Sequence, residues 1–261
     1  MRWTVALCFA LMVVALAWLG IEFANNLLRD PEAERVRTVV DTHLPPYSSV
    51  GRVLGSRTCT GALVLHPRIV VTAAHCVVET DDTLRKDTVS FQLAGQLGTG
   101  LATFRGRVTL VGSTRQYAGH TVQDEPLDWA IIVLDKAPPN TRPLLLRSLN
   151  RSELRAMGGR ISLPAYSIKA AEGKAMAIDK SCSIFDIRWG VFIHDCEGSK
   201  GSSGAPLLVD ASEGFAVVGI HSASLHVPGK NDWPADFVGA AVRSSSFESA
   251  VMAVRDRLAQ K

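Results

Sequence analysis

The most regular pattern in the chain is a series of short apolar, β-branched runs separated by Gly, Ser, Thr and Asp residues. The runs begin near Ser48 and read SVGRVL, GALVLHPRIVVTA, DTVSFQL, RGRVTLVG, DWAIIVL, FAVVGIHSAS and FVGAAV. Many short strands with turn residues between them are typical of a β-sandwich or β-barrel rather than of alternating strands and helices. The pattern therefore predicts an all-β domain.

The pattern changes near the C-terminus, where apolar residues recur at helical intervals. These residues are Phe247, Val251, Val254 and Leu258. Ser245 and Glu248, just before this run, have the spacing of a capping box. We therefore expect a C-terminal amphipathic α-helix that starts with this cap.

The N-terminus carries an uninterrupted apolar run, Trp3–Ile21, preceded by Arg2. The run is just long enough to span a bilayer, it is long for the core of a signal peptide, and no clean cleavage motif follows it. Residues 1–24 are therefore expected to form a hydrophobic leader helix, either a retained signal anchor or a cleaved signal peptide. The positive-inside rule keeps Arg2 in the cytoplasm, so we expect the rest of the chain at the periplasmic or extracellular face.

The segment after the leader has a different composition. Asp30 and Pro31 resemble a helix start, a charged run follows, and Pro45-Pro46 ends it. We predict that residues 25–46 form a tether with a short helix and that residues 47–261 form the folded domain.

Composition excludes several classes of protein. The chain has 261 residues, of which 47% are hydrophobic and 20% are charged, so it is not a disordered protein. The net charge of +3 and the absence of a dense basic block argue against nucleic-acid binding. Long apolar segments do not recur, which excludes a polytopic membrane protein. We expect a monomer.

The cysteines indicate an oxidising compartment. Cys8 lies in the leader, and the other four residues of this type are an even number, as disulfide pairing requires: Cys59, Cys76, Cys182 and Cys196. Spacing alone leaves their three possible connectivities open. The chain has no C-x-x-C motif, and His194-Asp195-Cys196-Glu197 has no second ligand cluster nearby, so we expect neither a metal nor another cofactor.

Three segments carry residues suited to nucleophilic catalysis. His75 follows the apolar run Ile69-Val70-Val71, Asp128 leads into another apolar run, and Ser203 lies in a Gly-Ser loop. Each alone has an ordinary explanation, respectively a loop histidine, an aspartate at a strand edge and a flexible loop. Together they supply a base, a carboxylate that orients it and a hydroxyl nucleophile, in the order His, Asp, Ser. An α/β-hydrolase would have the opposite order and a glycine at position 205, where this chain has Ala205.

The segments TAAHC (72–76), DWAIIVL (128–134) and GSSGAP (201–206) resemble the active-site motifs of trypsin/chymotrypsin-like serine endopeptidases. The resemblance extends from about Tyr47 to the C-terminal helix. It implies two six-stranded antiparallel β-barrels with the catalytic cleft between them. It also implies that Ser203 is the nucleophile, His75 the general base and acid, and Asp128 the residue that orients His75.

The resemblance has further implications for the site. The backbone N–H groups of Gly201 and Ser203 would form the oxyanion hole. The Cys59-Thr60-Gly61 segment resembles the disulfide around the histidine loop of this family, which implies the pair Cys59–Cys76 and leaves Cys182–Cys196 as the second pair.

The chain also departs from trypsin. Ser202 stands where trypsin-type members have an aspartate that pairs with a newly released amino terminus, and no I-V-G-G start follows the leader. We therefore expect no activation cleavage of the trypsin type. This pattern is more similar to the bacterial V8-like, glutamyl-endopeptidase branch of the family.

The substrate pocket is predicted less directly. His221 falls where glutamyl endopeptidases place a histidine that contacts a substrate glutamate, and Ser222 follows it on the same strand. The other interpretation is a strand histidine packed against the pocket wall. Glu197 lies about where trypsin-like members carry the aspartate that selects basic residues, but the loop before Ser203 is longer here, so the count does not transfer directly.

These observations predict an exported serine endopeptidase that acts on protein or peptide substrates through an acyl-enzyme. An uncleaved leader would tether it to the membrane. The alternatives are a catalytically silent protein of the same fold that binds a peptide or a partner, and a serine esterase on that fold.

Overall fold

This computed structural model describes residues 37–78, 87–94, 101–112, 125–169, 173–226 and 237–260. The predicted leader, Cys8 and the first part of the predicted tether lie outside these residues. No helix within the described ranges is long and apolar enough to cross a membrane.

The first half of the domain is a closed antiparallel barrel of six strands in the order β2-β3-β4-β7-β6-β5. The strands are β2 (Val50–Leu54), β3 (Thr58–Leu63), β4 (Ile69–Thr72), β5 (Thr88–Ala94), β6 (Leu101–Val111) and β7 (Ala130–Leu134). Its interior is filled by alternate apolar residues such as Val70, Phe91 and Ile132. Inward and outward positions alternate along a strand, as expected for a small barrel.

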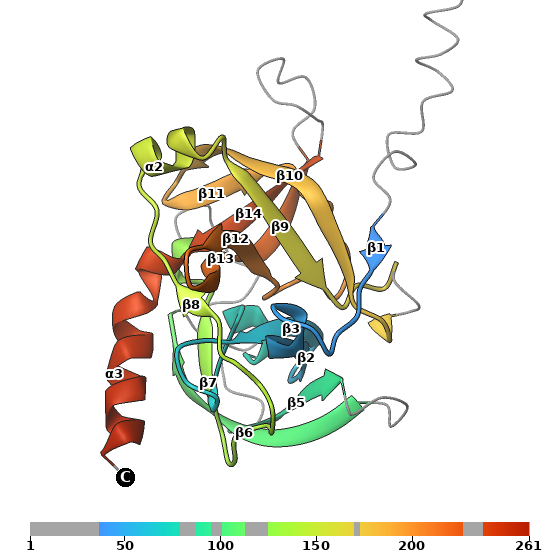
Figure 1. Cartoon of the computed structure of the whole chain (residues 1–261), viewed down its shortest axis with the longest axis vertical. Coiled ribbons are helices and arrows are strands. Elements are labelled where there is room, and N and C mark those ends of the chain that lie inside the picture. Colours follow the sequence, from blue (N-terminus) through green and yellow to red (C-terminus); the bar gives the residue numbers. More distant parts are fainter. Residues whose placement is uncertain are drawn as a thin grey trace, which may run out of the picture. The chain divides into compact units, whose positions relative to one another are not determined.

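The second half is a sheet that runs β10-β11-β14-β13-β12-β9 and closes through pairing of β9 with β10. These strands are β9 (Arg160–Ala165), β10 (Ala177–Arg188), β11 (Val191–His194), β12 (Pro206–Ala211), β13 (Gly214–His226) and β14 (Phe237–Arg243). The two short strands β1 (Thr38–Val39) and β8 (Leu145–Leu146) add to β10 and β13, respectively. The two predicted six-stranded antiparallel barrels are confirmed (Figure 1).

Helices are few among the described residues. They are α2 (Arg151–Ala156), α3 (Glu248–Ala259) and the 3-10 turns η1 (Tyr47–Ser49), η2 (Ala74–Cys76), η3 (Glu125–Leu127) and η5 (Ser244–Ser246). The predicted C-terminal helix is therefore confirmed as α3. The predicted capping box is wrong, because Phe247 is the N-cap and the carboxylate of Glu248 instead accepts a hydrogen bond from Ser148 Oγ at 2.5 Å.

The described part of the predicted tether is not helical. Thr38 and Val39 form β1, and Val40 N–H donates to Met176 O at 3.2 Å. The β-branched residues that follow the charged run favour this extended conformation over a helix. Residues 37–46 thus belong to the same compact unit as the barrels, which begins at Arg37.

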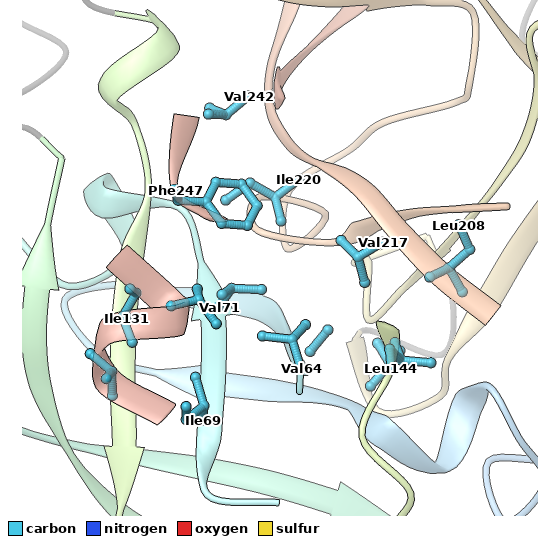
Figure 2. Close-up of a cluster of buried hydrophobic side chains, with 14 of the residues drawn as sticks. Val64, Ile69, Val71, Ile131, Leu144, Leu208, Val217, Ile220, Val242 and Phe247 are labelled. Atoms are coloured by element: carbon cyan, nitrogen blue, oxygen red, sulfur yellow. The ribbon is translucent and has the colours of Figure 1, made fainter. Parts of the chain in front are cut away.

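A shared apolar cluster joins the two barrels (Figure 2). Ile69 and Val71 of β4 point into it, whereas Val70 points into the first barrel, so this strand is buried on both faces. The second barrel contributes residues such as Ile220, and Phe247 at the start of α3 lies fully buried among them. Burial of each such large side chain stabilises the fold by roughly 1.5–3 kcal/mol. This cluster fixes the first barrel against the second.

Candidate active site

His75 and Asp128 meet at one end of the first barrel. His75 lies in η2, which follows β4 after one residue, and Asp128 lies two residues before β7, the strand paired with β4. Asp128 Oδ1 accepts the backbone N–H of His75 at 3.0 Å, and Asp128 Oδ2 lies 2.8 Å from His75 Nδ1. Because an ionised carboxylate only accepts hydrogen bonds, Nδ1 carries the proton and Nε2 is the ring nitrogen that can accept a hydrogen bond.

Asp128 is 2% exposed, yet its surroundings favour the charged form. Burial alone would raise its pKa, but the adjacent His75 and the hydroxyl of Ser222 outweigh burial and lower the pKa below its usual value. Ser222 Oγ donates to Asp128 Oδ2. A register shift in β13 between His221 and Ala223 sets Ser222 out of the regular pairing, as a β-bulge does. Asp128 is therefore held by three donors.

Ser203 lies at the tip of the loop between Cys196 and β12. Ser203 O accepts a hydrogen bond from Thr60 N–H of β3 at 2.9 Å, which ties the loop to the first barrel. At Gly204 φ is +77°, and a Cβ atom there would lie 2.1 Å from Thr72 Oγ1 and 2.9 Å from Ala73 N. Only glycine permits this approach. The half-buried Ser203 is thereby brought against the segment that leads into His75.

The backbone of this loop presents free donors beside Ser203. Within the described ranges, the N–H groups of Gly201 and Ser203 donate no hydrogen bond to the protein, whereas that of Ser202 donates to Ser199 O at 2.8 Å. Gly201 has φ +95°, and a Cβ atom there would lie 2.4 Å from Tyr166 O. Thr60 Oγ1 donates to Gly201 O at 2.8 Å. The turn is therefore fixed with two donors left over for a ligand oxygen.

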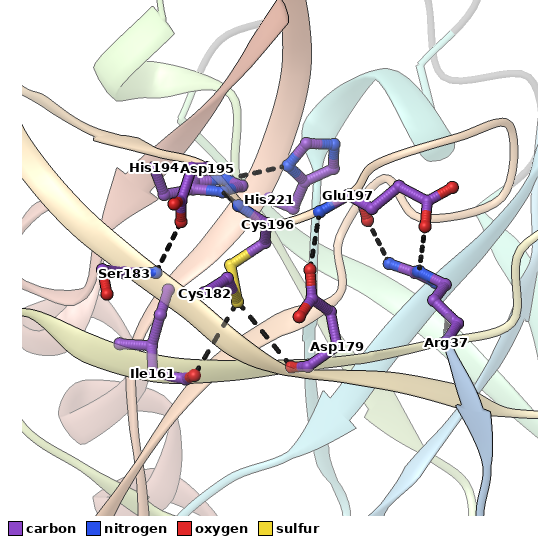
Figure 3. Close-up of a disulfide and its surroundings, with 10 residues drawn as sticks. All are labelled: Arg37, Ile161, Asp179, Cys182, Ser183, His194, Asp195, Cys196, Glu197 and His221. Atoms are coloured by element: carbon purple, nitrogen blue, oxygen red, sulfur yellow. Dashed lines mark hydrogen bonds and ion pairs between the residues drawn. A yellow bond between two sulfur atoms is a disulfide. The ribbon is translucent and has the colours of Figure 1, made fainter. Parts of the chain in front are cut away.

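His221 is buried against a second histidine, which the sequence analysis did not assign to the site. His221 Nδ1 lies 3.1 Å from His194 Nε2, and His194 Nδ1 accepts the backbone N–H of Cys196 at 3.1 Å (Figure 3). Because a backbone N–H only donates, His194 Nδ1 is unprotonated and its Nε2–H donates to His221. His221 therefore carries its own proton on Nε2.

Burial keeps both imidazoles neutral. Desolvation lowers the pKa of His194 to about 3. Desolvation, followed by the neighbouring His194 and Arg37, lowers the pKa of His221 well below its usual value. Protonation would also be opposed by the hydrogen bonds. A proton on His194 Nδ1 would face the N–H of Cys196, and a proton on His221 Nδ1 would face the Nε2–H of His194. A glycine makes room for this arrangement, since a Cβ atom at Gly239 of the paired strand would lie 2.1 Å from His194 Cε1.

The Nε2 side of the His221 ring lies close to Gly198 and Ser224. A Cβ atom at Gly198 would lie 2.7 Å from His221 Nε2 and 3.0 Å from Ser224 Oγ. A histidine N–H and a hydroxyl thus flank one point where residue 198 has no side chain. Ser224 was not predicted, although its place two residues after Ser222 on the same strand could have indicated it.

Glu197 lies at the start of the loop, where its carboxylate is already paired. Lys169 Nζ lies 2.9 Å from Glu197 Oε1, and Arg37 Nε lies 4.0 Å from Glu197 Oε2. The backbone N–H of Glu197 donates to Asp179 Oδ2 at 3.0 Å. The Glu197 carboxylate is therefore already paired with two basic side chains of the protein itself. In a substrate pocket, such a carboxylate would select basic side chains of the substrate.

Two disulfides flank these residues. Cys59–Cys76 joins β3 to η2 next to His75, and Cys182–Cys196 joins β10 to the start of the Ser203 loop. They are the pairs that the resemblance implied. Within the described ranges, one group of potential metal ligands comes together, Cys59, His75 and Cys76. It is not a metal site, because both sulfurs are in the disulfide and His75 is bound to Asp128.

Comparisons with known proteins agree with this geometry. The sequence model of the trypsin family, described as Trypsin, matches residues 38–248. No curated protein matches the chain. Among solved structures, one described as a Glu endopeptidase in complex with MPD is similar, with a TM-score of 0.63 and 19% sequence identity. The similarity covers 86% of this chain and 98% of that chain.

Proposed function

Since the chain belongs to the trypsin family, we propose that it is an endopeptidase whose catalytic residues are Ser203, His75 and Asp128. The observation that carries the proposal is the pair of hydrogen bonds that the backbone N–H and the ring Nδ1–H of His75 donate to Asp128. It selects the imidazole tautomer in which Nε2 can accept a proton, which is the state that a general base for a serine hydroxyl requires.

The reaction follows from these positions. His75 Nε2 takes the Ser203 hydroxyl proton as Oγ attacks the peptide carbonyl carbon. The N–H groups of Gly201 and Ser203 bind the oxyanion of the tetrahedral intermediate, and removal of such a donor typically costs about 10²–10³ in turnover. His75 then donates its proton to the leaving amine, which gives an acyl-enzyme. A water molecule, deprotonated by His75, hydrolyses the acyl-enzyme and regenerates Ser203.

We propose that the enzyme prefers an acidic residue before the cleaved bond. The His221 Nε2–H and the Ser224 hydroxyl both lie close to Gly198, so both could donate to a substrate carboxylate that approaches beside this glycine. The similar solved structure is that of a Glu endopeptidase, which is consistent with this assignment. A peptide library should show preference for Glu or Asp, and His221→Ala should remove it. A preference for basic or apolar residues that His221→Ala leaves unchanged would contradict the specificity.

We further propose that the enzyme acts outside the cytoplasm, tethered by its N-terminal segment if the leader is retained. The two disulfides agree with an oxidising compartment. Fractionation of cells that express the full chain tests both points. The enzyme should become accessible to added protease when the outer layers of the cell envelope are permeabilised and the cytoplasmic membrane is intact. If the leader is retained, the enzyme should stay in the membrane fraction after a carbonate wash.

Fluorophosphonate labelling of the purified full chain in mild detergent tests the catalytic assignment. Ser203→Ala and His75→Ala should abolish labelling, whereas His66→Ala, which changes a histidine elsewhere in the first barrel, should retain it. A folded, disulfide-intact sample that does not label would contradict the proposal and favour a silent binding protein. A labelled enzyme that hydrolyses esters but no peptide would instead indicate an esterase.

A further inference from the structure

Arg37 is the first described residue of the compact unit, and its guanidinium reaches the loop that carries Ser203. Arg37 Nη2 donates to the backbone oxygen of Glu197, and Nη1 donates to Ser167 Oγ at 3.3 Å. The Arg37 side chain is 6% exposed. Figure 3 shows this guanidinium directed at Glu197, and the Asp179 carboxylate directed at the backbone N–H of the same residue.

An arginine at this degree of burial requires compensation, because taking a charge out of water is costly. Burial lowers the pKa of Arg37, while the charges of Glu197 and Asp179 act in the opposite direction and favour the cation. Asp179 is 5% exposed and accepts the backbone N–H of Glu197, so the charges of two carboxylates act on one guanidinium. Loss of the guanidinium would leave these carboxylates with Lys169, which is 42% exposed, as the remaining cation in contact with Glu197.

Glu197 connects this cluster to the proposed chemistry. It follows the disulfide residue Cys196 and immediately precedes Gly198, which lies close to His221 Nε2. The far end of the loop is fastened to Thr60 of the first barrel, through Gly201 O and Ser203 O. The near end is fastened by Arg37 and Asp179.

The residue before the nucleophile does not supply a charged anchor. Ser202 is fully buried, and its hydroxyl accepts the N–H of Ser199 at 3.2 Å within the same loop. Its bonds therefore shape the turn but do not attach the loop to the barrel wall. The charged side chain that holds the loop is Arg37, which lies outside the loop.

We propose that Arg37 is a positioning residue that holds the loop 196–202 in the conformation needed for catalysis. The inference rests on the proposed function, since it assigns the loop to the proposed oxyanion hole and substrate pocket. In this arrangement the side chain that orders the loop belongs to the uncut chain just ahead of β1, and no free amino terminus is needed. A protein that begins at β1 would contain all strands of both barrels but would lack Arg37.

The test uses the full chain in mild detergent, with Arg37→Ala, Arg37→Lys and the unaltered protein. We expect Arg37→Ala to slow fluorophosphonate labelling of Ser203 by about 10- to 100-fold, the range that corresponds to loss of a hydrogen bond to a charged group. Arg37→Lys should recover part of the rate, and added ethylguanidinium should accelerate Arg37→Ala but not the unaltered protein. Rescue by a free cation is an effect that a general loss of stability would not produce.

Arg243→Ala is the matched control. Arg243 is another partly buried arginine of the second barrel, and its Nη2 donates to the backbone oxygen of Leu149 at 2.9 Å, away from the loop. Its loss should lower thermal stability and leave the labelling rate of the folded protein unchanged. If Arg37→Ala does not fold, the labelling rate of Arg37→Lys is compared with that of Arg243→Ala. The proposal then requires a lower labelling rate in Arg37→Lys than in Arg243→Ala.

The outcomes separate the two proposals. Labelling of the unaltered protein together with an unchanged rate in folded Arg37→Ala, or a reduced rate that ethylguanidinium does not restore, would overturn the role of Arg37. If Arg37→Lys is the variant used, a rate equal to that of the unaltered protein would overturn it as well. Failure of the unaltered, folded protein to label would overturn the catalytic assignment of Ser203, and with it the inference.

Discussion

Replacing His194 should change how the stability of the protein depends on pH. In the folded state His194 is neutral, with a pKa of about 3 caused by burial, whereas an exposed histidine of the unfolded chain has a pKa of about 6.5. Below pH 6.5 the unfolded state therefore binds a proton that the folded state does not bind. Acidification consequently favours unfolding, and the stabilising contribution of the neutral histidine is lost as the pH falls below 6.5.

The magnitude follows from proton linkage. Between pH 7.5 and pH 5, one such histidine lowers the free energy of unfolding by about 2 kcal/mol. The pKa of His221 is lowered in the same direction, so its neutral ring adds to this loss of stability on acidification. Asp128 titrates at lower pH, since its folded pKa is below its usual value, and it adds little above pH 5.

The assay is urea unfolding of the full chain in mild detergent at several pH values, in a Ser203→Ala background that prevents self-cleavage. His194→Gln removes one of the two titrations, so its loss of stability between pH 7.5 and pH 5 should be about 2 kcal/mol smaller than that of the parent. Phe247→Ala is the control, because it destabilises the fold without removing a titratable group. Equal pH dependence in the parent and His194→Gln would refute the reasoning.

Three further substitutions have definite expected outcomes. Gly198→Ala places a Cβ atom 2.7 Å from His221 Nε2 and should raise KM for acidic peptides by about 10-fold or more, measured by steady-state kinetics; an unchanged KM would exclude the region beside Gly198 and His221 as the proposed substrate pocket. Gly204→Ala combines φ +77° with a contact of 2.1 Å to Thr72 Oγ1 and should abolish fluorophosphonate labelling, so a labelled variant would contradict the geometry of the turn. Phe247→Ala empties a fully buried position between the barrels and should lower the free energy of unfolding by about 3–5 kcal/mol, whereas a loss below about 1 kcal/mol would show that the shared cluster does not depend on it.

Strands and helix were accessible from sequence because their patterns are local. The run Ile69-Val70-Val71 is apolar throughout, and the structure shows why: this strand lies between the interior of the first barrel and the cluster shared with the second. The helical spacing that starts at Phe247 likewise reflects one buried face of α3. The predicted capping box is wrong because Phe247, which is buried in the core, is the N-cap, so the helix starts at Glu248.

The candidate site was accessible only in part. His75, Asp128 and Ser203 stand in recognisable motifs, but the partnership of His194 with His221 depends on strand register. These histidines are brought together because β11 and β13 both pair with β14, and the absence of a side chain at Gly239 leaves space for the ring. Arg37 was hidden for another reason, since its local sequence looked helical and its partners lie 130 and 160 positions away.

The division of the proposed site between two separately closed barrels has a consequence for biosynthesis. His75 and Asp128 belong to the first barrel, while Ser203 and the His221 pocket belong to the second. A nascent chain that has completed only its first barrel carries a base without a nucleophile, so it has no means of cutting its neighbours. The proposed site is complete only when the second barrel has closed and packs against the first through the apolar cluster around Phe247. The order of synthesis thus delays proteolysis until the chain is itself compact and resistant to it.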